Sequence, residues 1–139
     1  MLRQQQRWQP VVTELYASLY GEQMVCSFST QLFHIPETKD LKGNAEMHTH
    51  LVPASYHRVT AMGSAQRFMN GETEHSILET LTGCIQKAEL RDRNVRSGLA
   101  VMKDAAPDQY KPVIDHIIQW QDYTELHLRN AKQLIASIT

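Results

Sequence analysis

Apolar residues recur at steps of three and four positions in three long stretches of the chain, and this spacing is what most restricts the fold. The first stretch lies between Pro10 and Pro36, and the residues on its apolar stripe are Val12, Leu15, Leu19, Cys26 and Phe33. Steps of three and four place side chains on one face of a helix, whereas a strand would alternate at every second residue. The sequence therefore predicts a long amphipathic helix from about Pro10, whose fixed φ suits a first helical turn, to Pro36.

Two more stretches show the same spacing in the second half of the chain. The third helix should follow the Asn70-Gly71 stop, with Thr73 or Ser76 as its N-cap, and run to about Lys103. Its apolar residues are Leu78, Leu81, Ile85, Ala88, Val95, Leu99 and Met102. The last helix is expected from about Pro107 to Ser137. Because the link between the two is short, they should form an antiparallel hairpin.

Residues 37–70 are the least regular part of the sequence. Residues 37–44 form a polar turn, and a helical pattern resumes at Ala45, is interrupted at Pro53, and continues to Asn70. A loop followed by a short helix is the alternative. Taken together, the pattern predicts one all-α domain over residues 1–139, an antiparallel four-helix bundle whose second helix is short or kinked at Pro53.

Composition excludes several classes of protein. The chain has 14 Lys and Arg against 15 Asp and Glu, so it lacks the basic excess of a general nucleic-acid-binding protein. No apolar run approaches the roughly 18 residues of a membrane span, and the polar first residues lack a signal-peptide core. We expect a cytoplasmic protein without a membrane partner. Cys26 and Cys84 are too far apart for a thiolate metal site and are expected to be buried.

Polar side chains interrupt the apolar stripes near the middle of three helices. Glu22 takes an inward position in the first helix, Asp92 in the third, and Thr124 and His127 in the fourth. Mid-helix positions of an up-and-down bundle meet at one height, so these groups should share a layer. A buried carboxylate without a partner costs several kcal/mol, so Glu22 and Asp92 should be paired or bound to a metal, unless they are more exposed than this pattern indicates.

Three interpretations of this polar layer stay open. It can be a satisfied buried network, a carboxylate and histidine metal site, or a ligand pocket of another kind. Iron or manganese would suit carboxylate and imidazole ligands on facing helices. Glu46 and His50 are four residues apart and could ligate one ion from the second helical segment. The Glu-x-x-His pair expected for such sites occurs only at Glu72 to His75, at a helix start.

The segments that carry these residues resemble a known family. Residues 119–127, with Gln119 and His127 eight positions apart, resemble the last helix pair of small bacterial ferritin-like proteins. The segments around Glu14, Glu22 and Glu46 are similar to YciF-type stress proteins of that family. The resemblance implies a four-helix bundle, a homodimer, a stress-related role and iron binding. The residues it places at the metal are Glu22, Glu46, His50 and His127, with Asp92 in place of a glutamate.

A second class of function is a non-catalytic helical interaction module, such as an adaptor or inhibitor. Trp8 lies just before the first predicted helix and Tyr16 and Tyr20 lie on it, and large aromatic residues are enriched in interface cores. They would then form a face for a protein partner or a second copy. Arg91, Arg93 and Arg96 are interleaved with acidic residues, which is typical of a solvated helix face, so nucleic-acid binding is not expected. The sequence does not decide whether the protein is an enzyme.

Overall fold

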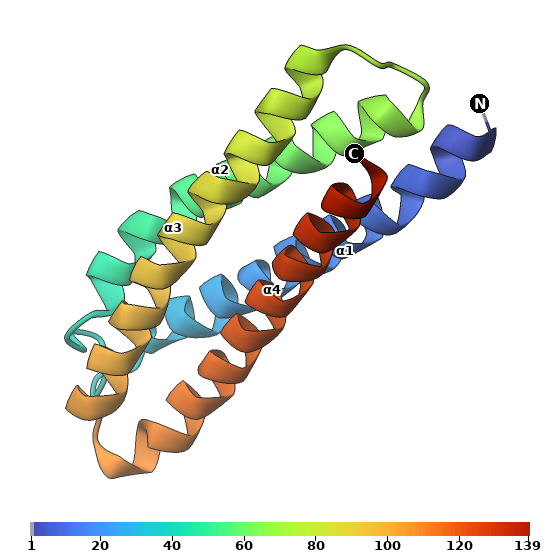
Figure 1. Ribbon diagram of the computed structural model, residues 1–139. Helices are drawn as coiled ribbons and strands as arrows, with labels where there is room; N and C mark the ends of the chain where they lie inside the picture. The colour runs from blue at the N-terminus through green and yellow to red at the C-terminus, as the bar shows by residue number, and fades with distance from the viewer. Residues whose placement is uncertain (1) are drawn as a thin grey trace.

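The protein is an all-α bundle of four long helices in a computed structural model that describes residues 2–139. The helices are α1 (Leu2–Gln31), α2 (Asn44–Met69), α3 (His75–Ala105) and α4 (Lys111–Ile138), with short 3-10 turns η1 (Leu32–His34) and η2 (Asp108–Tyr110). Successive helices run in opposite directions, so the two ends of the chain lie at the same end of the bundle (Figure 1). Each helix packs against its neighbours in the order α1, α2, α3, α4 and back to α1.

The first helix begins eight residues earlier than its sequence pattern predicted, at Leu2, so Pro10 lies inside α1 rather than at its start. A proline inside a helix loses one backbone hydrogen bond and normally bends or ends it. Packing on both sides of Pro10 outweighs this cost. Trp8 is buried and stacks on Phe68 of α2 with ring centroids 4.5 Å apart, and Val11 is fully buried. Trp8 is therefore a core residue and not part of a docking face.

The predicted interruption at Pro53 is absent. Helix α2 is 26 residues long and includes Pro53. Leu51 and Ala54, on either side of the proline, are both buried, so packing holds the two halves of α2 in one helix.

The prediction that both cysteines are buried was wrong for one of them. Cys84 is buried, but Cys26 is exposed.

The apolar core has two parts with a polar layer between them. One part contains residues near the chain ends and the link between α2 and α3, such as Leu15, Phe68 and Leu128. The other lies toward the opposite end and includes Leu32 and Met102. Between them the buried polar side chains are Ser18, Glu22, Arg58, Asp92, Gln121 and Thr124. The sequence correctly predicted a polar layer at mid-height.

The apolar spacing of the last helix predicted inward positions for Val113, Trp120, His127 and Leu134, but in α4 the residue after each of them is the buried one. The buried residues of this helix are Ile114, Ile117, Gln121, Thr124, Leu128, Ala131 and Ile135. Val113 is exposed, and Trp120 and His127 are only partly buried. At 113/114 and 134/135 both members of the pair are aliphatic, so the spacing alone could not separate them. At 120/121 the apolar character of Trp120 favoured that residue, but the structure buries Gln121. As a result Gln121, and not His127, occupies the inward position in the polar layer.

Candidate functional site

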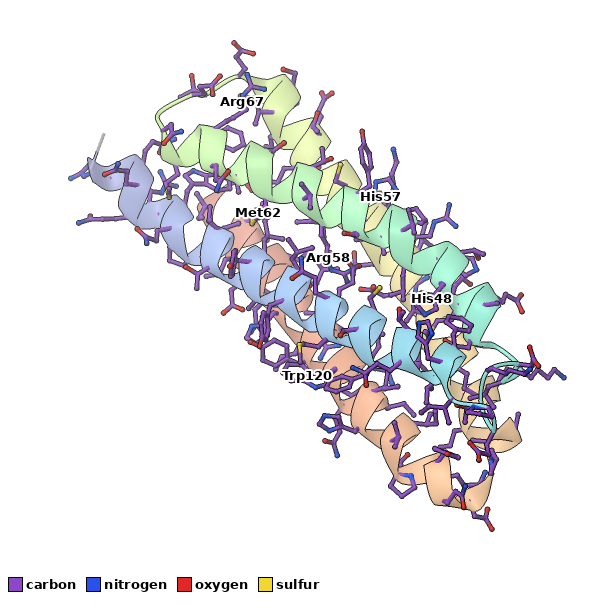
Figure 2. The ribbon with its side chains drawn as sticks, turned by 180° about the vertical axis from the view of Figure 1, so that it is seen from behind. His48, His57, Arg58, Met62, Arg67 and Trp120 are labelled. Atoms are coloured by element: carbon purple, nitrogen blue, oxygen red, sulfur yellow. The ribbon has the colours of Figure 1, made fainter. Side chains whose placement is uncertain are left out.

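The centre of the polar layer is Arg58 of α2, whose side chain is fully buried between α1 and α2 (Figure 2). Its two terminal nitrogens form ion pairs with two carboxylates: Nη1 with Oε2 of Glu22 on α1, and Nη2 with Oδ2 of Asp92 on α3. Its Nε donates a hydrogen bond of 2.9 Å to the hydroxyl of Ser18. One guanidinium thus joins three helices, which suits its planar set of donors.

The fourth helix joins this network through Ser18. The Ser18 hydroxyl donates to the backbone carbonyl of Thr124 over 2.7 Å, and the Thr124 hydroxyl in turn donates to the carbonyl of Trp120 over 2.8 Å. The buried Gln121 donates from Nε2 to Glu125 over 3.0 Å. All four helices are therefore held at mid-height by buried polar contacts. Such networks favour one register of the bundle when their members are satisfied.

The ionised network carries two negative charges and one positive charge in a buried site. Burial raises the pKa of Glu22 to about 7, against the attraction of Arg58, and the neighbouring Asp92 charge raises it further. Burial also raises the pKa of the Asp92 carboxyl, again against the attraction of Arg58. Burial would lower the pKa of Arg58, but the charges of Asp92 and Glu22 hold it above its usual value. Uptake of one proton, shared by the two carboxyls, would make the buried layer neutral.

The network reaches the surface of the bundle on two sides. Glu22 lines a groove of about 310 Å³ between α1 and α2, and its Oε1 has no hydrogen-bond partner among residues 2–139. Asp92 lines a smaller groove of about 180 Å³ between α3 and α4, together with Glu125, Arg93 and Arg129. The first groove is mainly apolar, and the second is bordered by charges of both signs. Both carboxylates are nevertheless almost fully buried, with exposed fractions of 3% for Glu22 and 4% for Asp92.

Glu46 and His50 lie one helical turn apart near the start of α2, at some distance along the helix from Arg58. They line a shallow groove of about 140 Å³ against α3. Glu46 is exposed, and Nη1 of Arg91 lies 3.1 Å from Nδ1 of His50. A permanently charged guanidinium beside this imidazole opposes the binding of a cation there.

His127 lies at the seam between α4 and α1, outside the buried layer. Its Nδ1 is paired with Oε2 of Glu14, and its ring contacts the edge of the Tyr123 ring at a centroid distance of 4.3 Å. Asn130 also reaches Glu14, over 3.5 Å. These contacts join α1 to α4 at the bundle surface.

The structure thus brings together only two of the five predicted metal ligands, Glu22 and Asp92, and places Arg58 between them. Within residues 2–139 no group of three or more His, Cys, Asp or Glu side chains is arranged to hold a metal ion. Iron or manganese binding stays a prediction. It can be tested by titrating the purified protein with ferrous iron, alongside the variants Glu22→Gln and His127→Ala, which the metal hypothesis expects to abolish uptake.

Arg58 was not among the residues predicted to form the site. Two inward carboxylates on different helices require a buried cation or protons, and the only Arg or Lys between residues 43 and 66 is Arg58. Arg58 also lies four residues after Ala54 and three before Ala61, which are both buried. Arg58 could thus have been identified as the buried cation, but only with a helical register for residues 45–70 that Pro53 made uncertain.

The comparisons with known proteins give no family for this chain. No protein-family model, curated protein or solved structure matches it. The ferritin-like resemblance therefore stays a prediction, and the proposals below rest on the geometry and chemistry of the chain itself.

Proposed function

We propose that this protein is a non-catalytic helical interaction module that binds a protein partner through the outer face of α1 and α2. The observation that carries the proposal is an exposed apolar and aromatic surface without a free charge on these two helices. We call it the α1–α2 face and define it by the side chains of Tyr16, Tyr20, Val52, Tyr56 and Val59.

These five side chains are among the most exposed large hydrophobic residues of the protein. Their exposed fractions are 64% for Tyr16, 47% for Tyr20, 74% for Val52, 69% for Tyr56 and 49% for Val59. Tyr16 and Tyr20 are one turn apart on α1, and Val52, Tyr56 and Val59 follow one stripe of α2. Val52 and Tyr56 line the groove between α1 and α2 together with Gln23 and Cys26 of α1. On the other side of α1 the ring of Tyr20 lies against that of Trp120 on α4, at a centroid distance of 5.8 Å.

Charged side chains are nearly absent from this half of the bundle. Between Trp8 and Pro36 the only Asp, Glu, Lys or Arg residues are Glu14 and Glu22, and between Met47 and Gln66 the only one is Arg58. Glu22 and Arg58 are buried, and Glu14 is paired with His127 of α4. The outward positions around the five apolar side chains are therefore polar but uncharged.

The opposite half of the bundle has the character of a solvated surface. Exposed ion pairs link α3 to α4 at three heights: Arg96 with Asp122 and Glu125, Lys103 with Asp115, and Lys132 with Glu89. Within the described residues, no helix has the length and apolar character needed to cross a membrane. The two halves of one bundle thus differ sharply in charge.

Depletion of charge together with enrichment in tyrosine is the compositional signature of interface cores. Tyrosine is also common among the residues that dominate binding energy, because it offers a large contact area and a polar tip at low entropic cost. Exposed apolar residues that occur singly need no explanation, but a grouped set with a polar rim marks a binding surface. The α1–α2 face has this grouping, and the buried network beneath it keeps the two helices in one register.

Site-specific photo-crosslinking tests the proposal. A benzophenone amino acid at Tyr56 in cells that naturally make the protein should yield a discrete adduct with a protein partner. The matched control is the same substitution at Leu126, an apolar residue of α4 that is 44% exposed. Adducts of equal yield at both positions, or none at Tyr56, would contradict the proposal.

A further inference from the structure

The seam between α3 and α4 lies on the opposite side of the bundle from the seam between α1 and α2 (Figure 1). We propose that it binds a single-chain fatty acid, with the aliphatic chain in a hollow near the end of α4 and the carboxylate between Arg93 and Arg129. This inference goes beyond the proposed function, because it concerns other residues and another class of ligand.

The seam is open because α3 and α4 pack less closely than any other neighbouring pair of helices in the bundle. A hollow of about 390 Å³ lies between them near the end of α4, and its walls are mainly apolar. Ile85 of α3 and Ile135 of α4 line it, although both belong to the apolar core and are only 3% and 4% exposed. Ala136 lines the hollow from an exposed position, and its side chain is too small to cover it.

The size and the walls of this hollow suit an aliphatic chain. Sites for small molecules have volumes of about 300–1,000 Å³ and are lined mostly by apolar side chains. Protein interiors are close-packed, so an open hollow of this volume leaves part of the core without packing partners. Each methylene group that moves from water into the hollow contributes favourably to binding.

A second hollow of about 180 Å³ continues the first along the seam, and charged side chains line it. Glu89 lines both hollows, so the two meet at this residue. Helix α3 rises by roughly 17 Å between Thr82, in the first hollow, and Arg93, in the second. The two hollows together form an elongated site with one apolar end and one charged end.

The arrangement of charges favours an anion at the charged end. Each carboxylate that lines the second hollow already has a cationic partner: Glu89 has Lys132, Asp92 has Arg58, and Glu125 has Arg96, which it shares with Asp122. Arg93 of α3 and Arg129 of α4 line the same hollow and form no ion pair or side-chain hydrogen bond within residues 2–139. These two guanidinium groups are therefore the ones available to a ligand.

A carboxylate fits these guanidinium groups better than other head groups do. A guanidinium can donate two parallel hydrogen bonds to one carboxylate, and such charge-assisted bonds are strong. A cation would be repelled by both arginines, and a neutral head would gain no charge-assisted bond. The carboxylates that line the hollow would repel a polyanion, so a ligand with a single negative charge is preferred.

Isothermal titration calorimetry of the full chain with decanoate, below the concentration at which it forms micelles, tests the inference. We expect saturable binding of one molecule per chain, at least about tenfold tighter than the binding of decanol, which has the same chain length without the charge. Acetate, which has the carboxylate without the chain, should bind too weakly to be detected. Absence of decanoate binding, or equal affinities for decanoate and decanol, would overturn the inference.

A variant of the apolar end tests where the chain lies. Ala136→Phe should fill the first hollow and weaken decanoate binding by at least about tenfold. Ser137→Phe is the control, because Ser137 is exposed on the same turn but does not line the hollow. Circular dichroism establishes that each variant is folded. Decanoate binding that is equal in the two variants would place the ligand elsewhere and overturn the inference.

A variant of the charged end tests the head group independently. Arg93→Gln together with Arg129→Gln should reduce the affinity for decanoate to that for decanol and leave decanol binding unchanged. Arg3→Gln together with Lys87→Gln removes the same charge from exposed positions outside the two hollows and should leave both affinities unchanged. Equal effects of the two double variants would show a general attraction of anions and overturn the assigned site.

The fatty acid must also be distinguished from a lipid surface as the source of the ligand. Vesicles of phosphatidylglycerol carry the same combination of aliphatic chains and negative charge. A chain that binds these vesicles in a flotation assay but does not bind decanoate would recognise a membrane surface, which would overturn the inference. The adduct at Tyr56 reports on other residues, so its presence or absence does not depend on this result.

Discussion

Replacement of Arg58 by methionine should strongly destabilise the protein, and the loss should depend on pH. Methionine fills much of the space of the arginine side chain but cannot pair with Glu22 or Asp92 or donate to Ser18. Removal of one partner from a buried ion pair costs about 3–5 kcal/mol, because a buried charge is left without compensation. A domain of this size is stable by about 5–15 kcal/mol, so the variant should fold but with a small margin.

The pH dependence distinguishes an electrostatic loss from a packing loss. In the Arg58→Met variant at pH 8, the buried carboxyls of Glu22 and Asp92 either stay ionised without a cation or take up protons, and both cost free energy. At pH 5 protonation is easier, so this cost is smaller. We therefore expect the difference in unfolding free energy between wild type and Arg58→Met to be larger at pH 8 than at pH 5. The measurement is urea unfolding followed by circular dichroism at one fixed protein concentration.

A triple variant tests whether the loss of stability in Arg58→Met comes from the uncompensated buried charges. Glu22→Leu, Arg58→Met and Asp92→Leu together remove all three charges and should recover the stability of the wild type or exceed it by about 1–4 kcal/mol. A loss below about 1 kcal/mol for Arg58→Met at pH 8, or a loss that is larger at pH 5, would refute this account of the buried network.

Two other predictions concern the same layer and the helix contacts beside it. The pKa of Glu22 is raised from 4.5 in the unfolded chain to about 7, so the folded state binds more protons between these pH values. The free energy of unfolding should therefore fall by up to about 3 kcal/mol as pH rises from 4.5 to 7. Denaturant titrations of Glu22→Gln should lack this part of the pH dependence. Gly21→Ala should lower the melting temperature, with a cost of about 1–3 kcal/mol, since the new Cβ would overlap the Thr124 hydroxyl and lie 2.8 Å from a ring carbon of Tyr123. Gly83→Ala, at a helical position with no neighbour within 4 Å, is the control and should raise stability by about 1 kcal/mol; a loss of stability there would contradict the helix-propensity argument.

The fold could be predicted from the sequence because it depends on periodicity over long stretches. Leu15 in α1 and Leu81 and Leu99 in α3 belong to long apolar stripes with helical spacing, and all three are buried. An error at one position of such a stripe does not change the prediction of a helix. The ends of α1 were harder to predict, since the cost of Pro10 inside a helix was outweighed by contacts of Trp8 with Phe68, a residue distant in the sequence.

The site could be predicted only in part, for a related reason. Glu22 and Asp92 interrupt clear stripes in α1 and α3, so their burial followed from the pattern. His127 was misplaced, because the aliphatic pairs Val113-Ile114 and Leu134-Ile135 allow two registers of α4, and a shift of one residue moves a side chain by about 100° around the helix. Arg58 was missed because Pro53 obscured the register of α2.

The α1–α2 face was predicted on one helix only. Tyr16 and Tyr20 were identified from their aromatic character, and both are exposed. The matching stripe of Val52, Tyr56 and Val59 lies on α2, and its orientation could not be derived while the helix itself was uncertain. Tertiary packing of α1 against α2 places Val52 and Tyr56 at the groove between the two helices.

The alkylation rate of Cys26 in cells tests the central claim most directly. This exposed thiol lines the groove of the α1–α2 face, and the buried Cys84 is an internal reference in the same chain. If a partner covers the face, N-ethylmaleimide should modify Cys26 slowly in the wild type. It should modify it several-fold faster in a Tyr16→Ser, Val59→Ser double variant, whose substitutions add no charge near the thiol. Equal rates in the two proteins, with Cys84 unchanged, would show that nothing covers the face and would contradict the account.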